Sequence, residues 1–310
     1  MQTAAAEIER MLAHPEFDRV VHRLASSFQA LQQAAPRLAA QFSTQQRWLM
    51  SHAALSRYFR SAAAGRAGVS RREFVEDALA HRLASRNTAQ AFFAEALKYG
   101  IILPTRTAIG SAGVLAMPAP AVLWALTEWH HAHLAALDAL DGGSRAAQLR
   151  EAGAEFLPRM QPAVADGLLA SSIIRTPAPD YAVFASVDEG GSLMDRLIAG
   201  LDMAAARDVD RAITDVTSVS ALARPFDVSR THAGRTLAAA IAIGSLGWCG
   251  AAGRSPIWLS QGFRAGYAQV QAAKLAVIGN AFDAATNFDG RAALPAVADA
   301  ALAERSGSPC

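Results

Sequence analysis

The sequence is poor in cysteine and lacks long apolar runs, and each shortage excludes a class of protein. Its 310 residues include only two cysteines, Cys249 and Cys310. Two are too few for a disulfide framework or a structural zinc site. The longest apolar stretch, residues 237–248, is interrupted by glycine and too short to span a bilayer. The N-terminal residues contain no apolar signal-peptide core. We therefore expect a cytoplasmic protein with no membrane partner.

The chain also has little charge of either sign. Charged residues make up 18% of it, hydrophobic residues make up 52%, and the formal net charge is +2. This composition excludes a disordered chain and favours a well-buried globular protein. A near-neutral net charge gives no support to nucleic-acid binding, although a protein with this net charge can carry a basic patch on one face. The length suggests about two domains.

The most informative stretch is residues 229–244, SRTHAGRTLAAAIAIG. It follows SVSALARPFDV and precedes WCGAAGRSPIWLS. In order, these segments predict a short helix, a tight turn, a second helix with a polar start, and a two-stranded wing. This is the layout of a winged helix-turn-helix, whose second helix enters the DNA major groove. Ser229 is a suitable N-cap, and Leu237, Ile241 and Leu246 are expected to face the core.

The same pattern occurs earlier, in residues 85–100, SRNTAQAFFAEALKYG. The offset is 229 − 85 = 144 at the Ser-Arg start and 244 − 100 = 144 at the terminal glycine. Both segments precede a wing-like stretch and a long apolar helix, which predicts an internal repeat of about 145 residues. With a boundary at Asp141-Gly142-Gly143-Ser144, the expected domains are residues 1–142 and 143–286, followed by a flexible tail over 287–310.

Helical spacing and breakers predict the remaining elements. The expected fold class is mainly α with small β-wings, arranged as two winged helix-turn-helix domains in one chain, a pseudo-dimer with helical connections. Residues 181–187 are expected to form a short strand, and Pro158 and Pro162 to break the helical segment 145–173. Further helices are expected over 17–35, 44–60, 71–83, 118–140, 192–207 and 261–285.

The predicted DNA-binding residues lie at the starts of the two recognition helices and in the wings. Arginine suits guanine, asparagine and glutamine suit adenine, and serine or threonine at a helix start more often contacts phosphate. The candidates are Ser85, Arg86, Asn87, Thr88, Gln90, Arg106, Ser229, Arg230, Thr231, His232, Arg235 and Arg254.

Other candidate sites are weaker. His130 and His133 share a helix face, but no second pair of ligands is evident, so a packed or solvated face is favoured over a metal site. The tryptophans near the wings favour core packing over an effector pocket; they are Trp124, Trp129, Trp248 and Trp258. No phosphate loop, nucleophile elbow or paired-carboxylate motif is present, so neither an enzyme nor a cofactor is expected.

The phrase SALARPFDVSRTHAGRTLAAAIAIGSLGW resembles the second helix, recognition helix and following strand of the MarR-type bacterial transcriptional regulators. The resemblance covers residues 44–140 and 192–285. The chain differs from that family in carrying two copies of the unit, where ordinary members are single-domain homodimers, and in lacking an Arg-rich wing tip. The resemblance implies a sequence-specific regulator whose partner is double-stranded DNA. A small-molecule effector and a homodimer remain open, as does the alternative of a protein-interaction or effector-sensing module without DNA binding.

Overall fold

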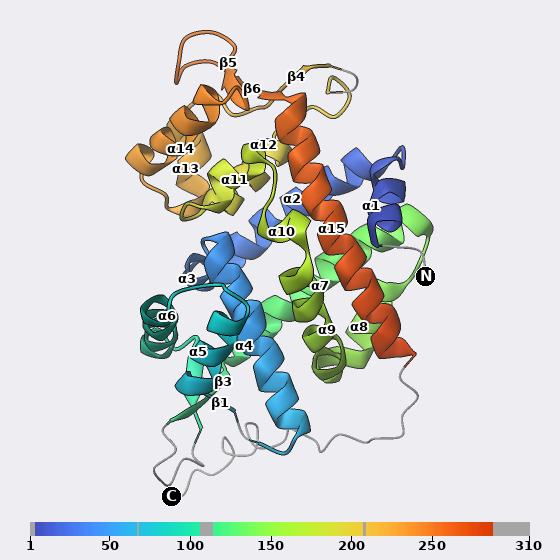
Figure 1. The fold of residues 1–310 in the computed structure, drawn as a ribbon. Coiled ribbons are helices and arrows are strands. Elements are labelled where there is room, and N and C mark those ends of the chain that lie inside the picture. The colour runs from blue at the N-terminus through green and yellow to red at the C-terminus, as the bar shows by residue number, and fades with distance from the viewer. Residues whose placement is uncertain (1–3, 67, 106–113, 207–208, 288–310) are drawn as a thin grey trace, which may run out of the picture.

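The computed structural model describes residues 4–66, 68–105, 114–206 and 209–287. This part of the chain is mainly helical, with two small antiparallel sheets of three strands each (Figure 1). No helix within these ranges is both long enough and apolar enough to cross a membrane.

The first half begins with four helices and continues with strands that flank a helix pair. Its elements are α1 (Ala4–Leu12), α2 (Phe17–Ala34), α3 (Pro36–Gln41), α4 (Gln45–Ala63), β1 (Val69–Ser70), α5 (Arg71–Ala80), α6 (Arg86–Lys98), β2 (Ile102–Pro104), β3 (Leu115–Pro118) and α7 (Pro120–Asp141). Gly142, with a φ of 75°, ends α7 in the left-handed conformation that glycine adopts easily.

The second half has a similar order. Its elements are α8 (Arg145–Ala152), η1 (Gly153–Phe156), α9 (Leu157–Ala170), α10 (Ser172–Arg175), α11 (Pro179–Ala185), α12 (Gly190–Ala199), β4 (Arg211–Ile213), α13 (Val219–Ala223), η2 (Arg224–Phe226), α14 (Arg230–Ala242), β5 (Leu246–Trp248), β6 (Ile257–Ser260) and α15 (Gln261–Thr286).

The spacing of these elements contains the repeat that the sequence predicts. Helices α6 and α14 are offset by 230 − 86 = 144 at their starts and 242 − 98 = 144 at their ends. Strands β2 and β5 have the same offset, 246 − 102 = 144. The sheets have the orders β1-β3-β2 and β4-β6-β5, so the last strand lies in the middle of each.

The two halves interlock through their long helices. Helix α2 of the first half packs on α12 of the second, and α9 of the second half packs on α4 of the first. In the same reciprocal way α1 contacts α15 and α8 contacts α7, while α7 and α15 contact each other. Because these contacts bury apolar side chains from both halves in one continuous core, the halves stabilise each other.

Local chemistry explains where the helices begin. Ser70 and Glu73 form a capping box at the start of α5, and serine side chains cap α6, α14 and α15 by accepting a backbone N–H. Each cap satisfies a donor that the first turn leaves unpaired, which fixes the first residue of the helix.

Several sequence-based expectations were wrong. Residues 181–187 do not form a strand: Pro179 starts the short helix α11, whose Tyr181 and Phe184 are buried. Pro162 lies inside α9 instead of breaking it, and the helix expected to extend to Arg207 ends at Ala199. Ile241 is 39% exposed, because the buried stripe of α14 follows Ala233, Thr236, Leu237 and Ala240. The predicted tail lies outside the described residues, apart from Asn287.

Candidate functional site: two exposed helices and a cavity between the halves

The predicted recognition residues of α6 divide into capping and exposed side chains. Ser85 Oγ accepts a hydrogen bond from the Thr88 backbone N–H over 3.2 Å and shares another with Thr88 Oγ1 over 2.9 Å. Arg86, Asn87 and Gln90 are exposed. Two of the five predicted residues therefore hold the helix start, and three are available to a ligand.

The corresponding residues of α14 divide in a similar way. Ser229 Oγ accepts the His232 backbone N–H over 3.1 Å. The His232 ring Nε2 lies 2.8 Å from the Asp188 carbonyl oxygen, to which it donates, so this ring is held against the segment that precedes α12. Arg230, Thr231 and Arg235 are exposed.

The structure describes one of the two predicted wing residues. Arg254 is exposed in the turn between β5 and β6. Arg106 lies outside the described residues. The second wing therefore offers one cation to a partner.

Carboxylates on α5 and α6 are paired with arginines. Arg57 Nε donates to Asp77 Oδ2 over 2.7 Å, Arg47 Nη2 to Glu95 Oε2 over 2.9 Å, and Arg66 Nη1 to Glu73 Oε1 over 2.6 Å. Burial opposes ionisation of Glu73, but hydrogen bonds from Ser70 and Arg66 lower its pKa to about 2. Within the described residues, Arg86, Arg230 and Arg235 form no ion pair. Their positive charge therefore remains available at the surface.

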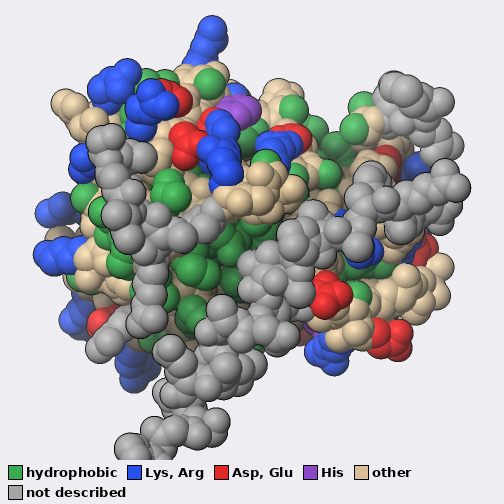
Figure 2. All heavy atoms as spheres, turned by 90° about the horizontal axis from the view of Figure 1, so that it is seen from below, with side chains coloured by type: hydrophobic (Ala, Val, Ile, Leu, Met, Phe, Trp, Pro, Cys, Tyr) green, Lys and Arg blue, Asp and Glu red, His purple; other side chains and the backbone are tan. Residues whose placement is uncertain are grey.

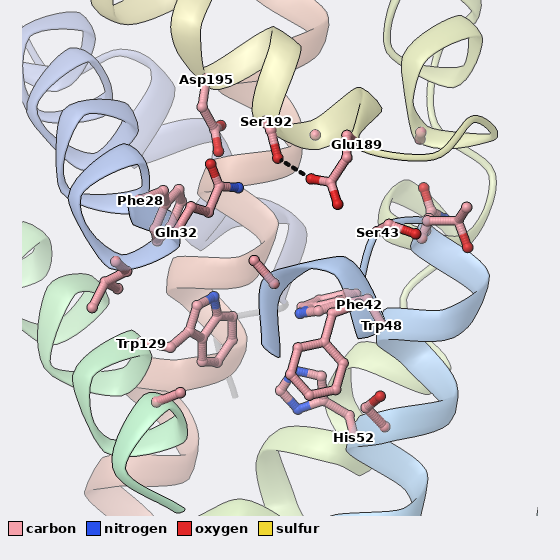
Figure 3. Close-up of a pocket in the computed structure, with 18 of the residues that line it drawn as sticks. Phe28, Gln32, Phe42, Ser43, Trp48, His52, Trp129, Glu189, Ser192 and Asp195 are labelled. Carbon is pink, nitrogen blue, oxygen red and sulfur yellow. Dashed lines mark hydrogen bonds between the residues drawn. The ribbon is translucent and has the colours of Figure 1, made fainter. Parts of the chain in front are cut away.

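A second candidate site is a cavity of about 250 Å³ where the two halves meet. Helices α2, α3, α4 and α7 of the first half and α11, α12 and α15 of the second line it. Its walls differ in chemistry (Figure 3): the aromatic rings of Phe42, Trp48 and Trp129 lie on one side, and Glu189, Ser192 and Asp195 lie on the other.

The aromatic wall is a cluster of contacting rings. Trp48 lies 5.9 Å from Trp129 and 4.6 Å from His52, measured between ring centroids. His52 lies 5.0 Å from Trp129. The ammonium group of Lys274, on α15, lies 5.0 Å from the centroid of the Trp48 ring, within range of a cation–π interaction.

The opposite wall is built by α12. Ser192 and Asp195, three residues apart, lie on one face of α12, and Glu189 is the N-cap residue that precedes this helix. Ser192 Oγ donates to Glu189 Oε2 over 2.7 Å, and Tyr267 Oη donates to Asp195 Oδ1 over 2.5 Å. Burial raises the pKa of Asp195 to about 7, although the Tyr267 hydrogen bond and the Lys274 charge oppose the rise. Burial also raises the pKa of Glu189 and lowers that of Lys274 to about 8.

Buried histidines lie beneath the aromatic wall. Gln161 bridges two of them: its Nε2 donates to His52 Nδ1 over 3.0 Å, and its Oε1 accepts from His130 Nε2 over 3.0 Å. His133 Nδ1 donates to the Trp129 carbonyl oxygen over 2.8 Å. Burial lowers the pKa of His52 to about 3 and of His130 to about 4, and it lowers the pKa of His133 well below its usual value. The three rings are therefore neutral at pH 7.

The structure also places the histidines and tryptophans that were the weaker candidate sites in the sequence. His130 and His133 are fully buried, and no group of three or more His, Cys, Asp or Glu residues suited to a metal ion occurs in the described part of the chain. Of the four tryptophans near the wings, Trp129 lines the cavity, joined by Trp48. The sequence reasoning missed Glu189, Asp195 and Lys274, although the three-residue spacing of Ser192 and Asp195 within an expected helix was a usable signal.

Comparisons with known proteins found no match at any level. No family model matches the chain, no curated protein matches it, and no solved structure matches it. Functional inference therefore depends on the residues and their geometry.

Proposed function

We propose that this protein is a sequence-specific DNA-binding transcriptional regulator, in which α6 and α14 are the recognition helices of two winged helix-turn-helix units. The observation that carries the proposal is the repeated order of a helix pair followed by two antiparallel strands, in which the second helices and the first strands are offset by 144 residues. In each unit the first turns of the second helix are exposed and carry arginine, asparagine, glutamine or threonine side chains.

The arrangement of the two units is compatible with one extended partner. Helices α6 and α14 both lie along the left side of the molecule in Figure 1, and the two sheets lie toward opposite ends. Two recognition helices on one chain suit two half-sites about one helical turn apart, roughly 34–36 Å. Because Arg86, Asn87 and Gln90 correspond to Arg230, Thr231 and Gly234, we expect the two half-sites to differ in sequence.

Local charge supports the proposal more than the net charge does. Seen from below, the molecule carries lysine and arginine side chains along the same left edge (Figure 2). Exposed cations on the two helix pairs and the second wing include Arg86, Lys98, Arg224, Arg230, Arg235 and Arg254. Phosphate contacts require such cations and produce salt-dependent binding.

A mobility-shift experiment with genomic fragments tests the proposal. We expect binding whose log affinity falls linearly with log salt, by about 0.9 per phosphate neutralised. The double variant Arg86→Ala/Arg230→Ala should weaken binding and reduce this slope by about 1 for each lost phosphate contact. The control, Arg10→Ala/Arg150→Ala, removes the same charge from exposed positions on α1 and α8.

The alternative is a protein-interaction or effector-sensing module that does not bind DNA, and the cavity between the halves favours its sensing form. Absence of binding to any duplex at low salt would support this alternative. Equal loss of affinity in the two double variants would show that neither helix start is the DNA-contacting surface.

A further inference from the structure

Two glutamines at the junction of the halves have unpaired hydrogen-bond acceptors. Gln271 is 1% exposed, and its Oε1, like Gln32 Oε1, is buried without a partner among the described residues. A buried acceptor without a donor destabilises the folded state. Both side chains line the cavity, but the two oxygens themselves are buried away from it and do not by themselves indicate a ligand.

The charged groups that line the cavity favour a ligand that carries positive charge. Two carboxyl groups, Glu189 and Asp195, and one ammonium group, Lys274, line the cavity. Lys274 already faces Asp195, whose charge acts on it, and the ring of Trp48. Glu189 has Ser192 as its hydrogen-bond partner, and the nearby Asp188 charge disfavours its ionised form. A ligand cation beside Glu189 would balance the charge of its carboxylate.

The aromatic wall matches the rest of such a ligand. Trp48 and Trp129 present ring faces and edges that bind both apolar rings and cations. The cavity volume of about 250 Å³ lies just below the range of about 300–1,000 Å³ typical of drug-sized ligands. It therefore suits a compact molecule of one or two rings.

We propose that the cavity binds a compact organic cation, a ring that carries a protonated amine, with the amine toward Glu189 and Ser192 and the ring against Trp48 and Trp129. Figure 3 shows these two sets of side chains facing each other across the cavity. An organic anion fits less well, because it would approach Lys274 beside two carboxyl groups. The assignment does not depend on whether α6 and α14 bind DNA.

The position of Glu189 links the cavity to α14. Glu189 has a φ of 56°, a left-handed conformation that is strained for a side chain with a Cβ atom. Its neighbour Asp188 accepts the His232 Nε2 hydrogen bond through its carbonyl and a hydrogen bond from Ser43 Oγ, 2.9 Å long, through its carboxylate. A ligand that contacts Glu189 therefore touches the segment that holds the first turn of α14.

Three probes that share a phenyl ring test the ligand class: phenethylamine, 2-phenylethanol and 3-phenylpropionate. Binding is measured by calorimetry and by quenching of tryptophan fluorescence. We expect phenethylamine to bind at least tenfold more tightly than the neutral alcohol and the anion. Glu189→Gln should remove that preference while retaining the Ser192 hydrogen bond, and Glu151→Gln, at an exposed position on α8, should not.

Other outcomes overturn the proposal. Tighter binding of 3-phenylpropionate, lost in Lys274→Met, would make the cavity an anion site. Equal affinities for all three probes would make it an apolar cavity without charge selection, and no binding of any probe would exclude the proposed ligand class. Thermal denaturation of each variant separates a loss of binding from a loss of folding.

Discussion

The two halves of the molecule share an element order but hold their exposed helices with different chemistry. In the first half, α5 has ten residues, and Arg57 and Arg47 on α4 pair with carboxylates on α5 and α6. In the second half, α13 has five residues, and α14 is held by the His232 contact with Asp188. The comparison shows that the repeat preserves the path of the chain while the contacts that fix each helix pair have diverged.

Unlike residues at equivalent positions of the two halves also line the cavity. Four pairs of positions 144 residues apart line it together: Gln45 and Glu189, Trp48 and Ser192, Ser51 and Asp195, and Leu126 and Val270. The cavity thus lies where equivalent parts of α4 and α12, and of α7 and α15, approach each other. The first half supplies Trp48 and Trp129, and the second supplies the carboxyl groups and Lys274, so the site is asymmetric although its frame is repeated.

The largest expected effect is a change in the free energy of unfolding with pH, to which buried groups of the two halves contribute with opposite signs. His52, His130 and His133, all in the first half, have folded-state pKa values below 6.5 because they are buried. These histidines do not destabilise the folded state above pH 6.5. The folded state loses stability as the pH falls further, because only the histidines of the unfolded chain take up protons. Between pH 7 and pH 5 each should cost about 2 kcal/mol of unfolding free energy, or about 6 kcal/mol together.

Asp195 in the second half acts in the opposite direction. Its folded-state pKa of about 7 lies above the ordinary 3.8, so the folded protein takes up this proton between pH 7 and pH 5 and gains about 2 kcal/mol. The net loss should be about 4 kcal/mol, measured by urea unfolding at the two pH values. Asp195→Asn should restore a loss of about 6 kcal/mol; an unchanged pH dependence in this variant would contradict the assignment of the compensating group.

The next effect compares the cores beneath α6 and α14. Phe93 and Leu237 occupy equivalent positions, since 237 − 93 = 144, and both are buried. Truncation to alanine removes buried surface and leaves a cavity, so we expect losses of roughly 4 kcal/mol for Phe93→Ala and roughly 3 kcal/mol for Leu237→Ala. Urea denaturation measures both. A larger loss for Leu237→Ala would indicate that the second half has the less adaptable core.

The sequence predicted the repeated elements well because their signals are local. Ser-Arg starts, glycine ends and helical periodicity identify α6 and α14 within one or two residues at each end. The cavity was not predictable in the same way, because Trp48, Asp195 and Lys274 lie on three helices that only the packing between halves brings together. The error at Tyr181 has a similar cause: seven residues between breakers fit either a strand or a short helix, and tertiary contacts decide between them.

A smaller effect concerns which half-site each of the proposed recognition helices, α6 and α14, would read. Arg230 and Arg235 lie five residues apart and so point about 140° apart on a helix with 3.6 residues per turn. In the proposed complex they would therefore contact different parts of a DNA duplex. We expect Arg230→Ala to relax base preference in one half-site at a cost of about 1–3 kcal/mol, and Asn87→Ala to do so only in the other.

Binding of both variants to a library of single-base operator variants measures this effect. Equal weakening on every sequence would assign both side chains to the phosphate backbone. Unchanged binding by both variants would place the reading surface elsewhere in the protein. A loss confined to one half-site for each variant would support the proposed division.

The smallest expected effect tests whether the repeat is energetically symmetric at the helix starts. Ser85 and Ser229 are equivalent N-caps, each accepting a backbone N–H, over 3.2 Å and 3.1 Å respectively. Alanine at an N-cap leaves that donor to water and typically costs about 1 kcal/mol. We expect Ser85→Ala and Ser229→Ala to lose that amount equally, because both caps are exposed and have the same geometry. Ser85→Asp and Ser229→Asp are matched controls that retain the acceptor and should lose little. A larger loss for Ser229→Ala would mean that the cap also positions His232 against Asp188, a contact whose equivalent the first half lacks because Thr88 occupies that position.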